Sequence, residues 1–346
     1  MNHAVNRAIA PPRLLWPALG GTLLIAMLIA ISIGRYAVPF DRVVGILLAN
    51  LIPFDGAWTT LEATVVENIR APRVLMAVLV GAGLAVAGAA LQGTFRNPLV
   101  GPQIIGVSSG ASFGGALAIV FTDSNLALVA LAFLFGLGAM VIVYAMSRVA
   151  GRSPVMMLVL AGVITSAFFT ALVSLLKYVA DPEDKLPAIV FWLMGSFAAA
   201  SYEKLAWLAV PLVGSILILY LMRWHINVLS LGDEEASAMG LKVGRTRWIV
   251  ILCVAAISAA VVAAAGVVGW VGLVVPHLAR MVVGPDHKTL LPAAALMGGI
   301  YLLAMDVGAR TLTPAEIPLG ILTAIIGAPV FAWLLRRTQA AGWGRD

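Results

Sequence analysis

The chain has 346 residues, of which 62% are hydrophobic and 11% are charged, and its formal net charge is +6. Soluble domains carry about 25% charged residues, and a single globule cannot bury this much apolar side-chain surface. The composition therefore excludes a soluble globular protein and predicts an integral membrane protein. The single cysteine, Cys253, lies in an apolar run, which excludes a disulfide framework and a cysteine-based metal site.

Ten apolar runs follow one another along the chain. A transmembrane helix needs ~20 predominantly apolar residues. The runs lie at 14–34, 74–95, 104–121, 126–147, 155–176, 205–222, 247–265, 267–283, 291–308 and 317–335. We therefore expect about ten transmembrane helices in one all-α membrane domain that covers residues 1–346.

An eleventh apolar stretch, Pro187 to Ala200, is too short to cross a bilayer. Non-helical backbone at membrane depth is tolerated only where it is buried in protein or lines a cavity. The stretch is therefore predicted to be a half-helix or a re-entrant segment.

Basic residues are unevenly distributed between the two sides of these spans. With the N-terminus inside, the inner segments hold most of the arginine and lysine residues, and the outer side holds most of the acids, including Asp55 and Asp181. Cytoplasmic loops carry an excess of lysine and arginine. We therefore expect both termini to be cytoplasmic.

The spans contain almost none of the acidic and histidine residues that a proton or sodium relay uses. Asp306 lies four residues before Arg310 and is interpreted as an i,i+4 ion pair on one helix face. His277 is interpreted as a structural residue, so no metal site is expected. The scarcity of such residues disfavours an ion-coupled secondary transporter, which is kept as the alternative to a transporter driven by ATP.

The sequence has no G-x-x-x-x-G-K-[ST] loop to hold ATP phosphates. The chain is therefore not expected to be an enzyme, and uphill transport would need ATP hydrolysis by another subunit. Residues 223–247 form the longest polar inner segment. In it, Asp233 is predicted to cap a short helix and Gly240 to end it, which favours a docking element over a solvated connector.

Several strings, in a fixed order from residue 70 onward, resemble the FecCD-type permeases, which import ferric siderophores, haem and cobalamin. They include RAPR (70–73), GAGLAVAGAALQGTFRNPLVGPQIIGVSSGA (81–111), WLMGS (192–196), NVLSLGDEEASAMGL (227–241), GWVGLVVPHLAR (269–280), GPDHKTLLP (284–292), DVGAR (306–310) and EIPLGILTAIIGAPVF (316–331). The resemblance covers the chain except for its first 69 residues.

This resemblance implies a type II ABC importer permease in the bacterial inner membrane. It implies two permease copies around a central passage, two ATPase subunits that bind ATP and Mg²⁺ on the inner face, and a periplasmic binding protein outside. No cofactor is expected on this chain and no nucleic acid partner. Ferric siderophore is the first expected cargo, followed by haem, cobalamin and an oxyanion such as molybdate.

The resemblance also assigns roles to three groups of residues. The expected coupling segment comprises Asp233, Glu234, Glu235, Ala236, Ala238, Met239, Gly240 and Leu241. The expected docking residues are Arg70, Arg73 and Arg310, whose planar guanidinium groups suit carboxylates of a binding protein; the alternative is that they anchor helix ends. The expected cytoplasmic gate comprises Asn97, Pro98, Leu99 and Ser153, although Asn97-Pro98 is also typical of a simple turn.

Overall fold

The computed structural model describes residues 14–50, 52, 56–148 and 155–340. These residues form helices joined by turns, without a strand. A helix coincides with each predicted span: α1 (Leu15–Ser32), α4 (Ala71–Phe95), α5 (Val107–Phe121), α6 (Asn125–Arg148), α7 (Val155–Val179), α9 (Tyr202–Leu221), α12 (Val243–Ala265), α13 (Val271–Val283), α14 (His287–Thr311) and α15 (Leu319–Ala340). The predicted all-α membrane protein is confirmed.

Among the described residues, seven of these helices are long and apolar enough to cross a bilayer. The others are shorter apolar helices, and α13 has only 13 residues. At 1.5 Å per residue such a helix is ~20 Å long, less than the ~30 Å of the hydrocarbon core. Irregular segments precede two of the short helices, namely η2 (Pro102–Ile105) before α5 and residues 266–270 before α13. Both segments line the cavity that is described below.

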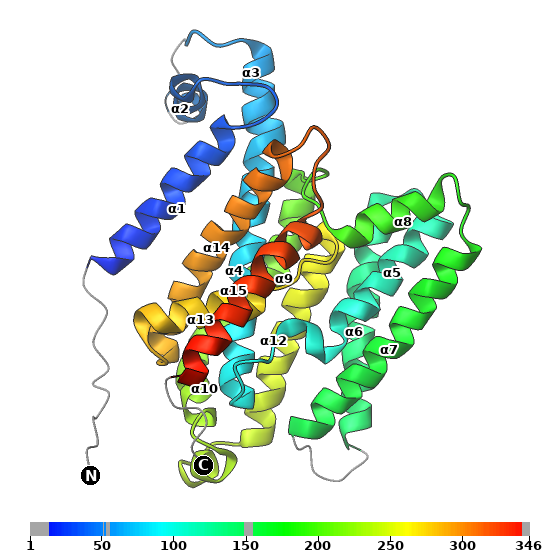
Figure 1. The fold of residues 1–346 in the computed structure, drawn as a ribbon, viewed down its shortest axis with the longest axis vertical. Helices are drawn as coiled ribbons and strands as arrows, with labels where there is room; N and C mark the ends of the chain where they lie inside the picture. Colours follow the sequence, from blue (N-terminus) through cyan, green and yellow to red (C-terminus); the bar gives the residue numbers. More distant parts are fainter. Residues whose placement is uncertain (1–13, 51, 53–55, 149–154, 341–346) are drawn as a thin grey trace.

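Helix α4 is the central element of the bundle, and it contacts α9, α12, α13 and α14 (Figure 1). Small residues allow these close crossings. A Cβ on Gly81 would lie 2.2 Å from the carbonyl oxygen of Gly298 in α14, and a Cβ on Gly88 would lie 1.8 Å from that of Gly272 in α13. Larger side chains at these positions would therefore separate the helices.

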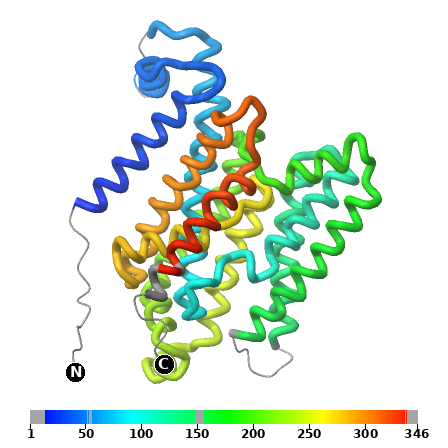
Figure 2. The backbone as a smooth tube through the Cα atoms, in the orientation of Figure 1, coloured from blue at the N-terminus to red at the C-terminus, as the bar shows by residue number. Residues whose placement is uncertain are grey.

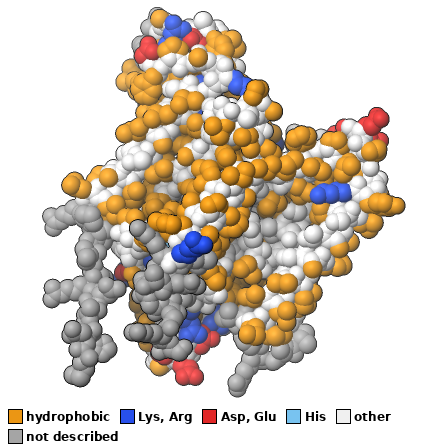
Figure 3. All heavy atoms as spheres, viewed as in Figure 1, with side chains coloured by type: hydrophobic (Ala, Val, Ile, Leu, Met, Phe, Trp, Pro, Cys, Tyr) orange, Lys and Arg blue, Asp and Glu red, His pale blue; other side chains and the backbone are white. Residues whose placement is uncertain are grey.

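Different elements lie at the two ends of the long axis of the molecule (Figure 1). One end carries α2 (Phe40–Ala49), α3 (Thr60–Thr64) and the π-helical turn η1 (Val65–Arg70), while α10 (Arg223–Leu229) and α11 (Asp233–Ala238) lie at the other. Figure 2 shows α1 along one edge and the α5–α8 segment along the opposite edge. On the face in Figure 3, hydrophobic side chains cover the middle and acidic side chains gather at the ends. This distribution fits a bundle that crosses a bilayer.

The stretch Pro187 to Ala200 contains most of the short helix α8 (Lys185–Met194), as the half-helix prediction requires. The helix ends at Gly195, where φ is +78°, a conformation that suits glycine. The Gly195 carbonyl accepts a hydrogen bond of 2.9 Å from the Leu319 amide, and the Ser196 amide donates to the Ala265 carbonyl at 2.9 Å. The end of α8 therefore joins α12 to the start of α15.

Candidate functional site

The predicted coupling segment forms a short helix, α11, at the end of the molecule where α10 and α12 meet (Figure 1). Its N-cap is Gly232, with φ +144°, and not Asp233 as the sequence suggested. Asp233 is the first helical residue, and its Oδ1 accepts a 2.6 Å hydrogen bond from Nη2 of the buried Arg247. Gly240 follows the C-cap with φ +81°, which confirms the predicted end of the helix.

One face of α11 packs against its own chain and the other is exposed. Ala236 is fully buried in a small apolar cluster with Val228, Leu229, Leu241 and Val243. The exposed residues of the segment are Asp233, Glu234, Glu235, Ser237, Ala238, Met239 and Gly240. Ala236 therefore does not lie on the exposed face of α11, because its side chain packs against α10 and the start of α12, and its role in coupling stays a prediction.

A polar joint connects the coupling segment to the centre of the bundle. Nδ2 of Asn227 in α10 donates to Oδ1 of Asp286 at 2.6 Å, and Oδ1 of Asn227 accepts from the His287 amide at 2.9 Å. The His287 ring is buried, with Nδ1 2.7 Å from Oδ1 of Asn227 and Nε2 3.3 Å from the Ala89 carbonyl of α4. Three helices, α4, α10 and α14, therefore meet at one set of hydrogen bonds.

The surroundings of the joint favour the charged form of Asp286 and close packing of the helices. Burial raises the pKa of the Asp286 carboxyl, but hydrogen bonds from the Lys288 amide and the Asn227 side chain outweigh it and hold this pKa below its usual value. A Cβ on Gly93 of α4 would lie 2.4 Å from Nε2 of His287 and 2.9 Å from Cγ2 of Ile226. Only glycine leaves room for this contact.

Sequence reasoning found no partner for His287. Asn227 and His287 lie in two of the matching strings, but about sixty positions separate them, and no local spacing rule pairs residues so far apart. Only the folded contact between α10 and α14 brings them together.

The predicted gate residues form a tight turn after α4. Arg96 has φ +52°, and Oδ1 of Asn97 accepts a 2.9 Å hydrogen bond from the Leu99 amide. Leu99 is 48% exposed and lines a cavity. The turn predicted at Asn97-Pro98 is thus present, while Ser153 lies outside the described residues.

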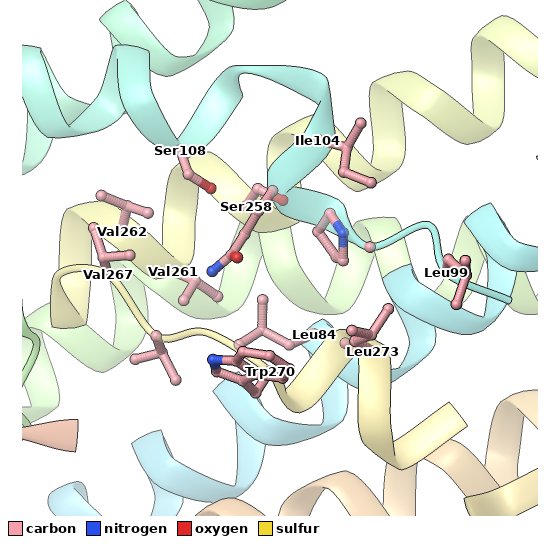
Figure 4. A pocket seen from close by; sticks show the side chains of 15 residues that line it. Leu84, Leu99, Ile104, Ser108, Ser258, Val261, Val262, Val267, Trp270 and Leu273 are labelled. Carbon is pink, nitrogen blue, oxygen red and sulfur yellow. The ribbon is translucent and has the colours of Figure 1, made fainter. Parts of the chain in front are cut away.

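The cavity, of about 220 Å³, lies between the two irregular segments and α12 (Figure 4). Its lining carries no charged side chain. Polar groups come from Gln103, Ser108 and Ser258, and apolar walls come from Leu84, Val261 and Leu273, among others. Oγ of Ser258 is buried without a hydrogen-bond partner among the described residues. A neutral lining of this kind can contact a polar solute without trapping it by charge.

Trp270 of this cavity lies in a strained backbone conformation, with φ +67°. Non-glycine residues at positive φ cost of order 1–3 kcal/mol and cluster at functional sites. The Trp270 ring packs edge-on against Phe331 of α15, with ring centroids 6.5 Å apart. Trp270 therefore links the cavity wall to α15.

The three predicted docking arginines lie at the opposite end of the molecule from α11, but all are buried. Arg70, Arg73 and Arg310 are 4%, 7% and 6% exposed. Arg70 donates to the carbonyls of Ile31 and Ser32 at 2.7 and 2.9 Å. This geometry favours the alternative role, in which an arginine fixes a helix end, and docking of a binding protein by these arginines stays a prediction.

Two of these arginines share a buried carboxylate. Nε of Arg73 donates to Oδ1 of Asp306 at 2.9 Å, and its Nη1 and Nη2 form a fork on Glu316 at 2.9 and 3.1 Å. Nε of Arg310 lies 3.5 Å from Oδ2 of Asp306, as expected for the i,i+4 pair. Glu316 lies in the loop before α15, so the cluster fixes that loop to α4 and α14.

A family model described as the FecCD transport family matches residues 22–337. The chain is 46% identical to the molybdate import system permease protein MolB of Haemophilus influenzae, over 92% of this chain and 94% of that protein. It is 44% identical to a probable iron chelatin transport system permease protein of Helicobacter pylori, over 80% of this chain and 83% of that protein. A solved structure described as an inward-facing metal-chelate type ABC transporter matches with a TM-score of 0.84 and 45% identity, over 92% of this chain and 98% of that one.

Proposed function

Since the chain belongs to the FecCD transport family of ABC importer permeases, we propose that it forms the membrane passage through which a metal oxyanion or chelate enters a bacterial cell. Permeases of this family are not enzymes themselves. ATP and Mg²⁺ then belong to a separate pair of ATPase subunits, and a periplasmic binding protein supplies the cargo. The chain works as a homodimer in the inner membrane, with both termini in the cytoplasm.

Molybdate is the first candidate cargo. The observation that carries it is 46% identity to a molybdate permease over 92% of the chain. This order departs from the sequence-based expectation, which placed ferric siderophore first and molybdate last. An iron chelate is the second candidate, because the 44% identical relative from Helicobacter pylori is named for iron chelatin transport.

Three parts of the structure support a role for this chain in passage and coupling. The exposed face of α11 offers Glu234, Glu235, Ala238 and Met239 to an ATPase. The turn at Asn97–Leu99 lies next to the cavity and forms the inner gate together with Ser153, which lies outside the described residues. The neutral cavity supplies polar contacts along the route.

The test is uptake into vesicles that contain the permease, its ATPase and its binding protein. Radiolabelled molybdate, a ferric siderophore, haem and cobalamin are compared with and without ATP, and with vanadate and an ionophore as inhibitors. We expect ATP-dependent molybdate uptake that vanadate blocks and the ionophore leaves intact. ATP-dependent uptake of only the iron compounds would replace molybdate by the second candidate, and ionophore-sensitive uptake by the permease alone would overturn the ABC importer function.

The same preparation tests the assembly. We expect two permease copies of 36.1 kDa each per two ATPase subunits by native mass spectrometry. A stable complex with a single copy of this chain would contradict the homodimer.

A further inference from the structure

A second hollow lies on the side of α12 that faces α6 and α9. Both helices pack against α12. The floor between them is formed by α12 alanines such as Ala264, whose side chains are too short to fill the gap. The result is a groove of about 550 Å³, distinct from the neutral cavity.

The walls of this groove are apolar and open to the surroundings. Leu134 of α6 is 61% exposed and Trp207 of α9 is 59% exposed. Pro211 of α9 also lines the groove. In a bilayer such walls face lipid chains, so an occupant needs an apolar tail that follows the groove along α12.

Lys204 is the one charged residue in the groove lining, and it lies in the first turn of α9, at the same end as the beginning of α6. Its side chain is half-buried, and none of the ion pairs formed by the described residues includes it. Tyr202 and Trp207 on the same helix are exposed, as is typical of residues at a membrane interface. An ammonium group at the end of an apolar groove matches an amphiphile with an anionic head.

We propose that the α6–α9–α12 groove binds a phospholipid with an anionic headgroup, whose phosphate pairs with Lys204 and whose acyl chain lies over Ala264. The lipid fills a gap that the alanines of α12 leave open, and its phosphate forms the direct ion pair that Lys204 does not make within the described part of the chain. The bound lipid packs between α6 and α9 and contacts both helices. This site is independent of the cargo and of the ATPase.

The test uses the purified permease in vesicles of equal phosphatidylglycerol and phosphatidylcholine, followed by mild delipidation and native mass spectrometry. We expect the wild type to retain phosphatidylglycerol over phosphatidylcholine by at least fivefold. Lys204→Gln should abolish this preference, and Ala264→Leu should lower retention of both lipids severalfold.

Two matched variants act as controls. Lys177→Gln removes a half-buried ammonium group in the last turn of α7, outside the groove, and should keep the preference. Gly214→Leu adds volume to α9 where a Cβ meets no atom within 4 Å and should keep retention. An unchanged preference in Lys204→Gln, or equal losses in the variants and their controls, would overturn the proposal. So would release of the lipid by millimolar inorganic phosphate, since the site would then bind the anion alone.

Discussion

Asp306 is fully buried near the end of α14, and two arginines compensate its charge. Arg73 reaches it from α4 at 2.9 Å, and Arg310 lies one turn further along α14 at 3.5 Å. The fork of Arg73 on Glu316 adds the loop before α15 to the same cluster. At the scale of single residues, this cluster is structural, because its carboxylates hold the guanidinium groups that were expected to meet a binding protein.

Replacing Arg73 by methionine should therefore destabilise the permease. The variant leaves Asp306 buried with weaker compensation, and breaking a buried pair costs roughly 3–5 kcal/mol. The free energy of unfolding in detergent is the measurement. Lys185→Met is the control, because Lys185 pairs with Asp123, whose side chain is 92% exposed, and such surface pairs are worth about 0–1 kcal/mol. Equal effects of the two variants would contradict the structural role.

Docking of a binding protein should instead depend on exposed charge at the same end. Arg35 is exposed and lies beside Arg310 in a shallow hollow. We expect Arg35→Glu to weaken the association of the binding protein severalfold and to leave basal ATP hydrolysis unchanged, because Arg35 is remote from α11. The measurement is the affinity of the binding protein for the reconstituted complex. An unchanged affinity would show that Arg35 has no part in docking.

Helix α11 is the element that we propose for coupling, and its two faces differ in their contacts. The apolar face, centred on Ala236, joins α10 and α12, while the Asp233–Arg247 pair fixes the start of α11 to α12. The polar joint at Asn227 then connects α10 to α4 and α14. These contacts connect α11 directly to α10 and α12 and, through α10, to α14 and α4.

Substitutions on the two faces of α11 should have separable effects. Ala238→Glu places a charge on the exposed face and should reduce ATP-driven uptake at least tenfold, while expression survives. An unpaired charge at an interface costs several kcal/mol. A cost of about 1.4 kcal/mol already corresponds to a tenfold change in an equilibrium constant. Ala236→Glu should instead lower stability and expression. Uptake, basal hydrolysis and stimulated hydrolysis are compared in vesicles, with Ala238→Ser as the control. Normal uptake by Ala238→Glu with the ATPase still bound would show that α11 is only a connector.

The Asn227 joint has its own prediction. Asn227→Ala removes the hydrogen bonds to Asp286 and His287, which should loosen α10 from α14 by roughly 1–3 kcal/mol for each polar group left unsatisfied. We expect ATP-driven uptake to fall severalfold. Basal ATP hydrolysis and binding of the ATPase to the permease should be unchanged. Ser230→Ala serves as the matched control, because Ser230 Oγ bonds only within its own helix end, to the Asn227 carbonyl. Similar uptake in both variants would remove the joint from the coupling route.

At the scale of the whole molecule, the bundle has two polar ends with different roles. One end carries α11 and the gate turn, and the other carries α2, α3 and the buried arginine cluster. Both irregular segments, before α5 and before α13, line the cavity between these ends. The cavity therefore lies where short helices leave backbone and small side chains accessible.

The orientation of the bundle is tested by cysteine labelling in a Cys253→Ala background. A cysteine in place of Glu183, in the exposed turn before α8, should react with an impermeant reagent from outside. A cysteine in place of the exposed Glu234 should react only after the membrane is opened. Labelling of position 234 in intact cells would reverse the topology.

The sequence alone determined the fold class, the positions of the spans, the short α8 and the coupling helix. These features depend on local composition: apolar length selects a membrane helix, and a glycine with positive φ ends α11 at Gly240. The family resemblance also came from local strings, and the family model confirms it.

Only the tertiary structure decided which polar residues are free and which are used internally. The arginines at 70, 73 and 310 looked available because no local pattern reveals an acceptor on a distant helix. Ala236 was expected in the coupling segment, and the residues next to it in the sequence do not reveal that it is buried against Val228 and Val243. The pairing of Asn227 with His287, and the groove between α6 and α9, likewise arise from packing of segments far apart in the sequence, where the free energy depends on contacts that local spacing does not specify.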